Sequence, residues 1–152
     1  MRQVKGFTIV ELIIGIAILG ILVALAAPSF TESIARRRLD GIANELSTDL
    51  QFTRAEAISK NTALTLVASA TGYTVGSVKT VTIDSSCSLS SGETLPLSVT
   101  FEPTRGMSTA ANLVFIGVAC SPQTTSTLRV NISTMGVINI CSPNGFGGYP
   151  SC

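Results

Sequence analysis

The sequence predicts an α+β protein in which one long N-terminal helix, half transmembrane and half amphipathic, packs on an antiparallel β-sheet domain. Three observations predict this class. An uncharged apolar run spans residues 12–27, apolar residues at helical spacing follow it, and short β-type runs fill the chain from Thr62 onward. We therefore divide the 152-residue chain into the segments 1–6, 7–27, 28–61 and 62–152.

The segment from Phe7 to Ala27 predicts a membrane-spanning helix, because its length is close to the ~20 apolar residues that such a helix needs. Glu11 is its only charged residue. A carboxylate inside an apolar membrane helix costs roughly 2.5–3.5 kcal/mol on insertion scales, so we expect Glu11 to have a partner or a function. Arg2 and Lys5 precede the span, which predicts a cytoplasmic N-terminus.

Beyond the span, Pro28 removes a helical hydrogen bond and is expected to kink the chain. Apolar or small residues then recur every three or four positions, which predicts one buried stripe on an amphipathic helix. The stripe consists of Ala35, Leu39, Ile42, Leu46, Leu50, Thr53 and Ala57. Lys60-Asn61 is the expected end of this helix. The run Arg36-Arg37-Arg38 is either a solvated face or a contact with anionic lipid head groups, and it is contrary to the positive-inside rule.

From Thr62 the composition changes to Ser, Thr, Val and Gly, with turn residues between short β-type runs. Such runs after an amphipathic helix predict a sheet laid over one helical face. The predicted strands are Ala63–Val67, Tyr73–Val75, Lys79–Ile83, Leu97–Glu102, Leu113–Val118, Leu128–Ile132 and Val137–Ile140.

Cysteine and histidine usage restricts the chemistry. The chain has no His, which excludes a Ser-His-Asp triad and histidine metal sites, so we expect no enzyme activity, no cofactor and no metal. Its four cysteines lack Cys-x-x-Cys spacing and indicate disulfides formed in an oxidising compartment. We expect Cys141 to pair with Cys152 around a short C-terminal loop and Cys87 to pair with Cys120, although four cysteines allow three connectivities.

The residues Gly6-Phe7-Thr8-Ile9-Val10-Glu11-Leu12 resemble the class III signal of type IV pilins and type II secretion pseudopilins. The resemblance implies a pilin-like fold, cleavage after Gly6 by a membrane peptidase, and methylation of the new N-terminal residue Phe7. It also places the family's assembly glutamate at Glu11 and its helix-kinking proline at Pro28. The apolar helix would remain on the mature protein.

The stretch Gln51–Asn61 is similar to the FimT/FimU/GspH branch of that family, in which Arg-x-Glu-Ala-Ile-x-x-Asn ends the helix. Matching residues are Arg54, Glu56, Ala57, Ile58 and Asn61. The resemblance continues loosely through Val99–Pro103 with Gly106, and through Ile132–Gly136. Arg54 and Glu56 lie two residues apart and cannot pair on a helix, so each is expected to cap or to contact the sheet.

The resemblance implies a minor type IV pilin that joins other major and minor pilins after processing by the prepilin peptidase. Its single span would lie in the inner membrane with the C-terminal domain periplasmic, and later on the pilus. A GspH-like type II secretion pseudopilin and a DNA-binding competence pseudopilin are the alternatives. DNA binding has weak support, because residues 135–139 lack the arginines of DNA-binding relatives and residues 62–152 balance three basic against three acidic residues.

Overall fold

The computed structural model describes residues 6–109, 113–121 and 126–152. The chain consists of two compact units, Met1–Ile34 and Ala35–Cys152, and helix α1 (Ile9–Ser59) contributes to both. Each unit is described by itself. The predicted leader lies almost entirely in residues 1–5, outside the described residues.

The first unit contains the apolar half of α1. Its large apolar side chains are exposed, from Phe7 through Leu25 to Phe30 and Ile34. Among the described residues, α1 is long and apolar enough to cross a membrane. The helix continues through position 28 without a break, and the side chain of Pro28 lies outside the described part of the chain, so the expected kink stays a prediction.

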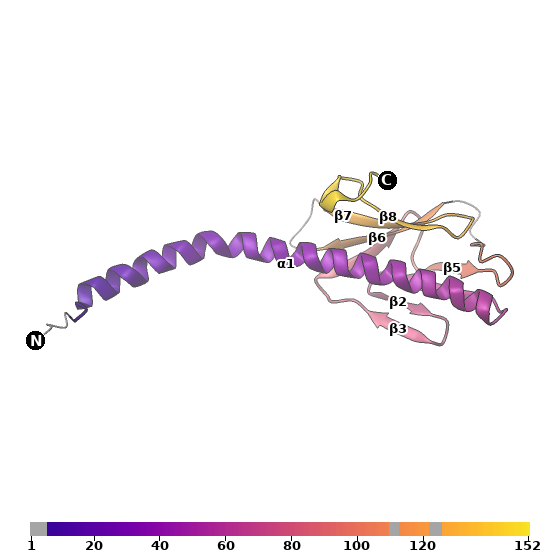
Figure 1. Ribbon diagram of the computed structural model, residues 1–152, viewed down its shortest axis with the longest axis horizontal. Coiled ribbons are helices and arrows are strands. Elements are labelled where there is room, and N and C mark those ends of the chain that lie inside the picture. The colour runs from indigo at the N-terminus through magenta and orange to yellow at the C-terminus, as the bar shows by residue number, and fades with distance from the viewer. Residues whose placement is uncertain (1–5, 110–112, 122–125) are drawn as a thin grey trace, which may run out of the picture. The chain divides into compact units, whose positions relative to one another are not determined.

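The second unit contains the amphipathic half of α1, whose predicted stripe is buried. Leu39, Leu46 and Leu50 are fully buried, and Ile42 packs against the same core. Ala43 is also fully buried and joins this stripe. Figure 1 shows this half of α1 (magenta) lying along the strands.

Eight strands in the described residues form two four-stranded antiparallel sheets, ordered β3-β2-β1-β5 and β4-β6-β7-β8. Side chains alternate between buried and more exposed along β5 and β7, as expected for strands with one face on a core. The strands are β1 (Leu64–Ser69), β2 (Gly72–Val75), β3 (Lys79–Thr82), β4 (Cys87–Ser91), β5 (Leu97–Phe101), β6 (Val114–Cys120), β7 (Thr127–Ile132) and β8 (Ile138–Cys141).

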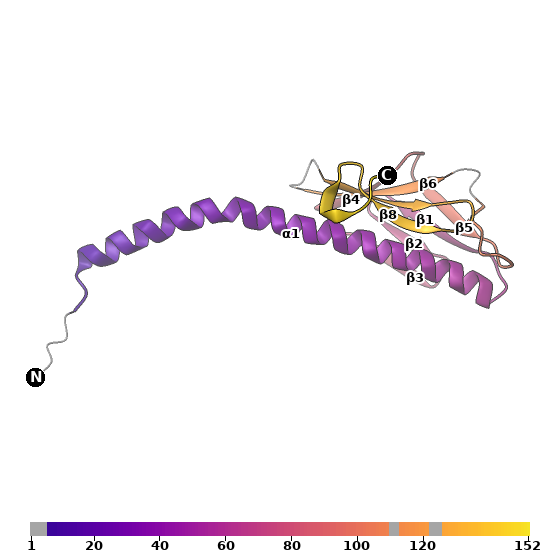
Figure 2. The ribbon, with the colours of Figure 1, turned by 45° about the horizontal axis from the view of Figure 1, so that its top comes forward.

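Both sheets and α1 share one hydrophobic core. Phe101 on β5, Ile116 on β6 and Leu128 on β7 are fully buried in the cluster that contains the α1 leucines. The predicted fold class, one long helix packed on antiparallel β-structure, is therefore confirmed. Figure 2 shows the two sets of strands above the helix, with the C-terminal loop (yellow) beside them.

Two features go beyond the single sheet that the sequence predicts. The strands divide into two sheets, and β4 is an additional strand. β4 was missed because Cys-Ser-Leu-Ser-Ser resembles a polar turn by composition. Only its alternation marks it as a strand, with Cys87 and Leu89 buried and Ser88 and Ser90 exposed.

Replacing Leu50 by Ala should lower the free energy of unfolding by about 2–5 kcal/mol, because the shortened side chain leaves a cavity at a fully buried position. The matched control is Phe52→Ala on the same helix. Phe52 is 41% exposed, so a substantially smaller loss is expected there. Urea unfolding of the full chain in detergent, followed by circular dichroism, measures both variants. Equal losses would contradict the assigned buried face.

Candidate functional site

The predicted cleavage site is exposed and lies outside the helix. Gly6 and Phe7 precede the first residue of α1, Ile9, and the side chain of Phe7 is 88% exposed. A β-carbon added at Gly6 would meet no atom within 4 Å. Nothing in the described fold therefore requires glycine at this position, and the cleavage expected there stays a prediction.

Glu11 caps its own helix. Its carboxylate accepts hydrogen bonds from the backbone amide and the hydroxyl of Thr8, both at 2.9 Å. The amide of Glu11 in turn donates to the Thr8 hydroxyl at 3.2 Å. This reciprocal pair is a capping box, with Thr8 at the N-cap and Glu11 three residues later.

The capping role was missed by the sequence analysis, although the Thr-x-x-Glu spacing before an apolar run is its usual signal. The capping box gives the Glu11 carboxylate partners within the chain and holds it beside the end of α1 where unpaired amides favour negative charge. The expected contact with a neighbouring subunit stays a prediction.

Arg54 ties the C-terminal end of α1 to two turns of the β domain. Its Nε donates to the carbonyl oxygen of Gly106 at 3.0 Å. Gly106 (φ +62°) and Gly136 (φ +73°) both adopt the left-handed conformation that favours glycine. A β-carbon at Gly136 would lie 2.1 Å from the Gly106 oxygen and 3.1 Å from Arg54 Nε, so both glycines allow a close approach of backbone.

The remaining motif residues end the helix. Glu56 pairs with Lys60 at 2.6 Å, and Ala57 is buried. Asn61 has φ +47°, its amide donates to Ile58, and the next amide donates to Ala57. These bonds form a Schellman motif with Asn61 at the C′ position, where Asn is a common alternative to Gly. The Arg-x-Glu-Ala-Ile-x-x-Asn pattern therefore ends the helix and joins it to the β domain.

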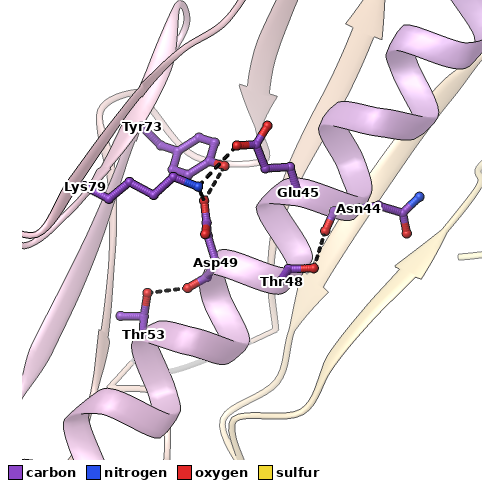
Figure 3. A network of polar contacts seen from close by, with 7 residues as sticks. All are labelled: Asn44, Glu45, Thr48, Asp49, Thr53, Tyr73 and Lys79. Carbon is purple, nitrogen blue, oxygen red and sulfur yellow. Dashed lines mark hydrogen bonds and ion pairs between the residues drawn. The ribbon is translucent and has the colours of Figure 1, made fainter.

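A buried carboxylate connects α1 to β2 and β3 (Figure 3). Asp49 accepts hydrogen bonds from the Tyr73 hydroxyl and from Lys79 Nζ, both at 2.7 Å. Lys79 also reaches Glu45 at 3.2 Å. Burial and the bond to Asp49 raise the pKa of Tyr73, and the hydrogen bond to Asp49 raises the pKa of Lys79. Each donor of this network is therefore kept protonated.

The C-terminal loop is fastened by a disulfide and by contacts to α1. The structure contains the disulfides Cys87–Cys120 and Cys141–Cys152, which are the pairs expected from the sequence. The Tyr149 hydroxyl donates to Asp40, and this hydrogen bond raises the pKa of Tyr149. A short 3-10 helix, Phe146–Gly148, forms the turn of the loop.

The cations of the described β domain lie on separate segments: Lys79 on β3, Arg129 on β7 and Arg105 in a turn after β5. Lys79 is bound to Asp49 and Glu45, and Arg129 stacks on the Phe115 ring with its guanidinium carbon 4.4 Å from the ring centroid. Arg105 is exposed. Within the described residues, no group of three or more His, Cys, Asp or Glu side chains could hold a metal ion.

Two family models match the chain. Residues 43–136 match the model described as type II transport protein GspH, and residues 1–27 match the prokaryotic N-terminal methylation motif. The first match covers α1 from Ala43 to its end and the β domain through Gly136, which leaves out β8 and the C-terminal loop. The second covers the signal and the apolar span.

Curated relatives are similar over part of the chain. A fimbrial protein of Moraxella nonliquefaciens is 43% identical over 70 residues, covering 41% of this chain and 46% of the relative. The type IV major fimbrial protein FimA of Dichelobacter nodosus is 38% identical over 66 residues, covering 39% of this chain and 41% of the relative. The chain thus spans less than half the length of these relatives.

Two crystal structures of the type IV minor pilin FimU from Pseudomonas aeruginosa share the fold. One has a TM-score of 0.58 at 19% identity, with 67% of this chain and 91% of that chain covered. The other has a TM-score of 0.60 at 20% identity, with 73% and 91% covered. At this identity the likeness concerns the fold.

Gly136→Ala should destabilise the second unit by roughly 2–5 kcal/mol. The new methyl group would meet the Gly106 carbonyl oxygen, and alanine disfavours the positive φ of this position. Gly145→Ala is the matched control, since Gly145 has φ +67° and open space around it. Urea unfolding in detergent measures the free energy of unfolding of both variants. Because both positions have a positive φ, the difference between the two losses isolates the steric effect at Gly136. Equal destabilisation of the two variants would contradict the close approach at Gly136.

Proposed function

Because the chain belongs to the GspH-like family of type IV pilins and pseudopilins, we propose that it is a minor type IV pilin. In this proposal the prepilin peptidase cleaves after Gly6 and methylates Phe7. The subunit is then incorporated into a pilus or into the complex that starts pilus assembly. The observation that carries the proposal is the methylation motif joined through one apolar helix to a GspH domain.

The proposed location follows from the apolar half of α1. Residues 7–27 would span the inner membrane, with Arg2 and Lys5 on the cytoplasmic side and residues 62–152 in the periplasm. Two disulfides in the β domain support an oxidising compartment. Other pilins and the inner membrane are therefore the proposed partners, and the subunit acts by assembly and performs no catalysis.

A type II secretion pseudopilin is the second candidate, and the description of the matching GspH model favours it. Deleting the gene separates the two functions. Loss of surface pili with normal protein secretion supports the minor pilin, and loss of secretion with normal pili supports the pseudopilin. DNA binding has less support, because Lys79 and Arg129 are already engaged by Asp49 and Phe115.

Gly6→Ala should abolish leader removal, since nothing in the described fold restrains position 6 and the glycine is proposed to be read by the peptidase. Immunoblotting detects the precursor by its larger mass. Gly41→Ala provides the control, because Gly41 is also exposed with open space around it and lies beyond the signal. Normal processing of the Gly6 variant would contradict the proposed cleavage site.

Glu11→Gln should leave processing intact and lower incorporation into sheared filaments by roughly ten-fold or more, because a buried amine of a neighbouring subunit would lose its counter-charge. Glutamine retains the capping-box geometry, since Gln also serves at that position. The variant therefore separates charge from capping.

Thr8→Ala is the matched partner variant, because it removes the hydroxyl contact to Glu11 and keeps the carboxylate. Its expected cost is about 0.5–2 kcal/mol of helix-end stability, with most incorporation retained. If Thr8→Ala fails to assemble while Glu11→Gln assembles normally, the function of Glu11 is capping and the proposed intersubunit pair is wrong.

A further inference from the structure

An apolar groove of about 510 Å³ lies between the C-terminal end of α1 and the start of β8. Both of its walls belong to the second unit. Large apolar side chains are exposed around it, with Ile58 44% exposed, Val137 48% exposed and Met135 in the adjoining turn 71% exposed. Such a cluster is typical of a binding surface. The groove is lined by Arg54, Ala55 and Ile58 from α1 and by Val137 and Ile138 from the opposite wall, among others.

One side of β8 is unpaired. β8 is the outer strand of its sheet and pairs with β7 alone. The amide of Ser133 donates to the carbonyl oxygen of Val137 at 3.0 Å, so these two residues form a hydrogen-bonded pair. Because such pairs alternate along antiparallel strands, Asn139 bonds to β7, and the peptide groups of Ile138 and Ile140 point away from it. Among the described residues β7 contributes nothing to the groove, which therefore lies along the unpaired side of β8.

The unpaired side of β8 is open to a further strand. Its sequence Ile-Asn-Ile-Cys contains neither Lys nor Pro, which natural edge strands often use to prevent pairing. The edge strand β3, by contrast, begins with Lys79. Ile138 and Ile140 pack against the hydrophobic core, so they hold the peptide groups of β8 in fixed positions. An extended segment can add to such an edge through main-chain hydrogen bonds, while its alternate side chains enter a neighbouring groove.

Arg54 brings a positive charge to the groove. Its side chain is half-buried, and its Nε donates to the carbonyl oxygen of Gly106 at 3.0 Å. Within the described residues, the N–H groups on Nη1 and Nη2 have no acceptor, and no carboxylate forms an ion pair with Arg54. Glu56, the nearest acidic residue in the sequence, pairs with Lys60 at 2.6 Å. The two Nη atoms are therefore available to a carboxylate, which guanidinium groups bind with paired hydrogen bonds.

We infer that the groove binds an extended segment of a partner protein, which pairs with the unpaired side of β8 and places an acidic side chain on Arg54. Because side chains two positions apart share one face of a strand, apolar residues two positions before and after the acid would contact Ile58 and Val137. The partner chemistry is therefore an acidic residue with apolar residues at both of these positions. The proposed cleavage, methylation and membrane anchoring require neither β8 nor Arg54, so this inference goes beyond the proposed function.

Amide hydrogen exchange of the full chain in detergent, followed by NMR, tests the site with a tethered probe. The probe Val-Thr-Asp-Thr-Val is added after Cys152, whose Cα lies 5.0 Å from the Cα of Cys141 at the end of β8. A Gly/Ser linker of about eight residues spans roughly 16 Å. Exchange of the Ile138 and Ile140 amides should slow roughly five-fold relative to the chain with the linker alone, because tethering holds the probe at millimolar effective concentration.

Two matched probes on the same chain separate the two parts of the recognition. Val-Thr-Lys-Thr-Val reverses the charge that meets Arg54. Pro-Pro-Asp-Pro-Pro keeps the carboxylate and removes every amide donor of the probe except that of Asp. Both should leave exchange of the Ile138 and Ile140 amides nearly unchanged.

No slowing with the Asp probe would overturn the site. Equal slowing with the Lys probe would overturn recognition of a carboxylate by Arg54, and equal slowing with the Pro probe would overturn strand addition to β8. Each of these results leaves cleavage after Gly6 untouched, so failure of this site can be told apart from failure of the proposed function.

Discussion

Burial of one stripe of α1 against the two β-sheets is the interaction on which the second unit depends. Leu39, Leu46 and Leu50 are fully buried in a core that both sheets share. Polar contacts then fasten separate segments to the flanks of the same helix: Asp49 to β2 and β3, Arg54 to the Gly106 turn, and Asp40 to the C-terminal loop. Burial of the apolar stripe contributes hydrophobic stabilisation, and these polar contacts fix the orientation of the attached segments on the helix.

The first unit differs from the second, because its large apolar side chains are exposed and require a partner surface. At its N-terminal end, the capping box of Thr8 and Glu11 supplies polar contacts within the chain. A lipid bilayer or the helices of neighbouring subunits would cover the exposed apolar surface. In the proposed function, the apolar half of α1 lies first in the membrane and, after assembly, in the filament.

The fold class and most elements could be predicted from the sequence, because the apolar span, the helical stripe and the alternating strands each have their own periodicity. Other features depend on contacts between distant segments. β4 has a turn-like composition, and its strand character comes from pairing with β6. The contact of Arg54 with Gly106 joins residues far apart in the sequence. By contrast, the capping box is local, and the spacing of Thr8 and Glu11 already contains its signal.

Mass spectrometry of wild-type filaments sheared from cells tests the central claim most directly. The account predicts that this chain is present in small amounts relative to the major subunit, that its N-terminal residue is Phe7, and that Phe7 carries one added methyl group. A chain that still begins with the leader, or one absent from filaments while abundant in the membrane, would contradict a processed and incorporated minor pilin.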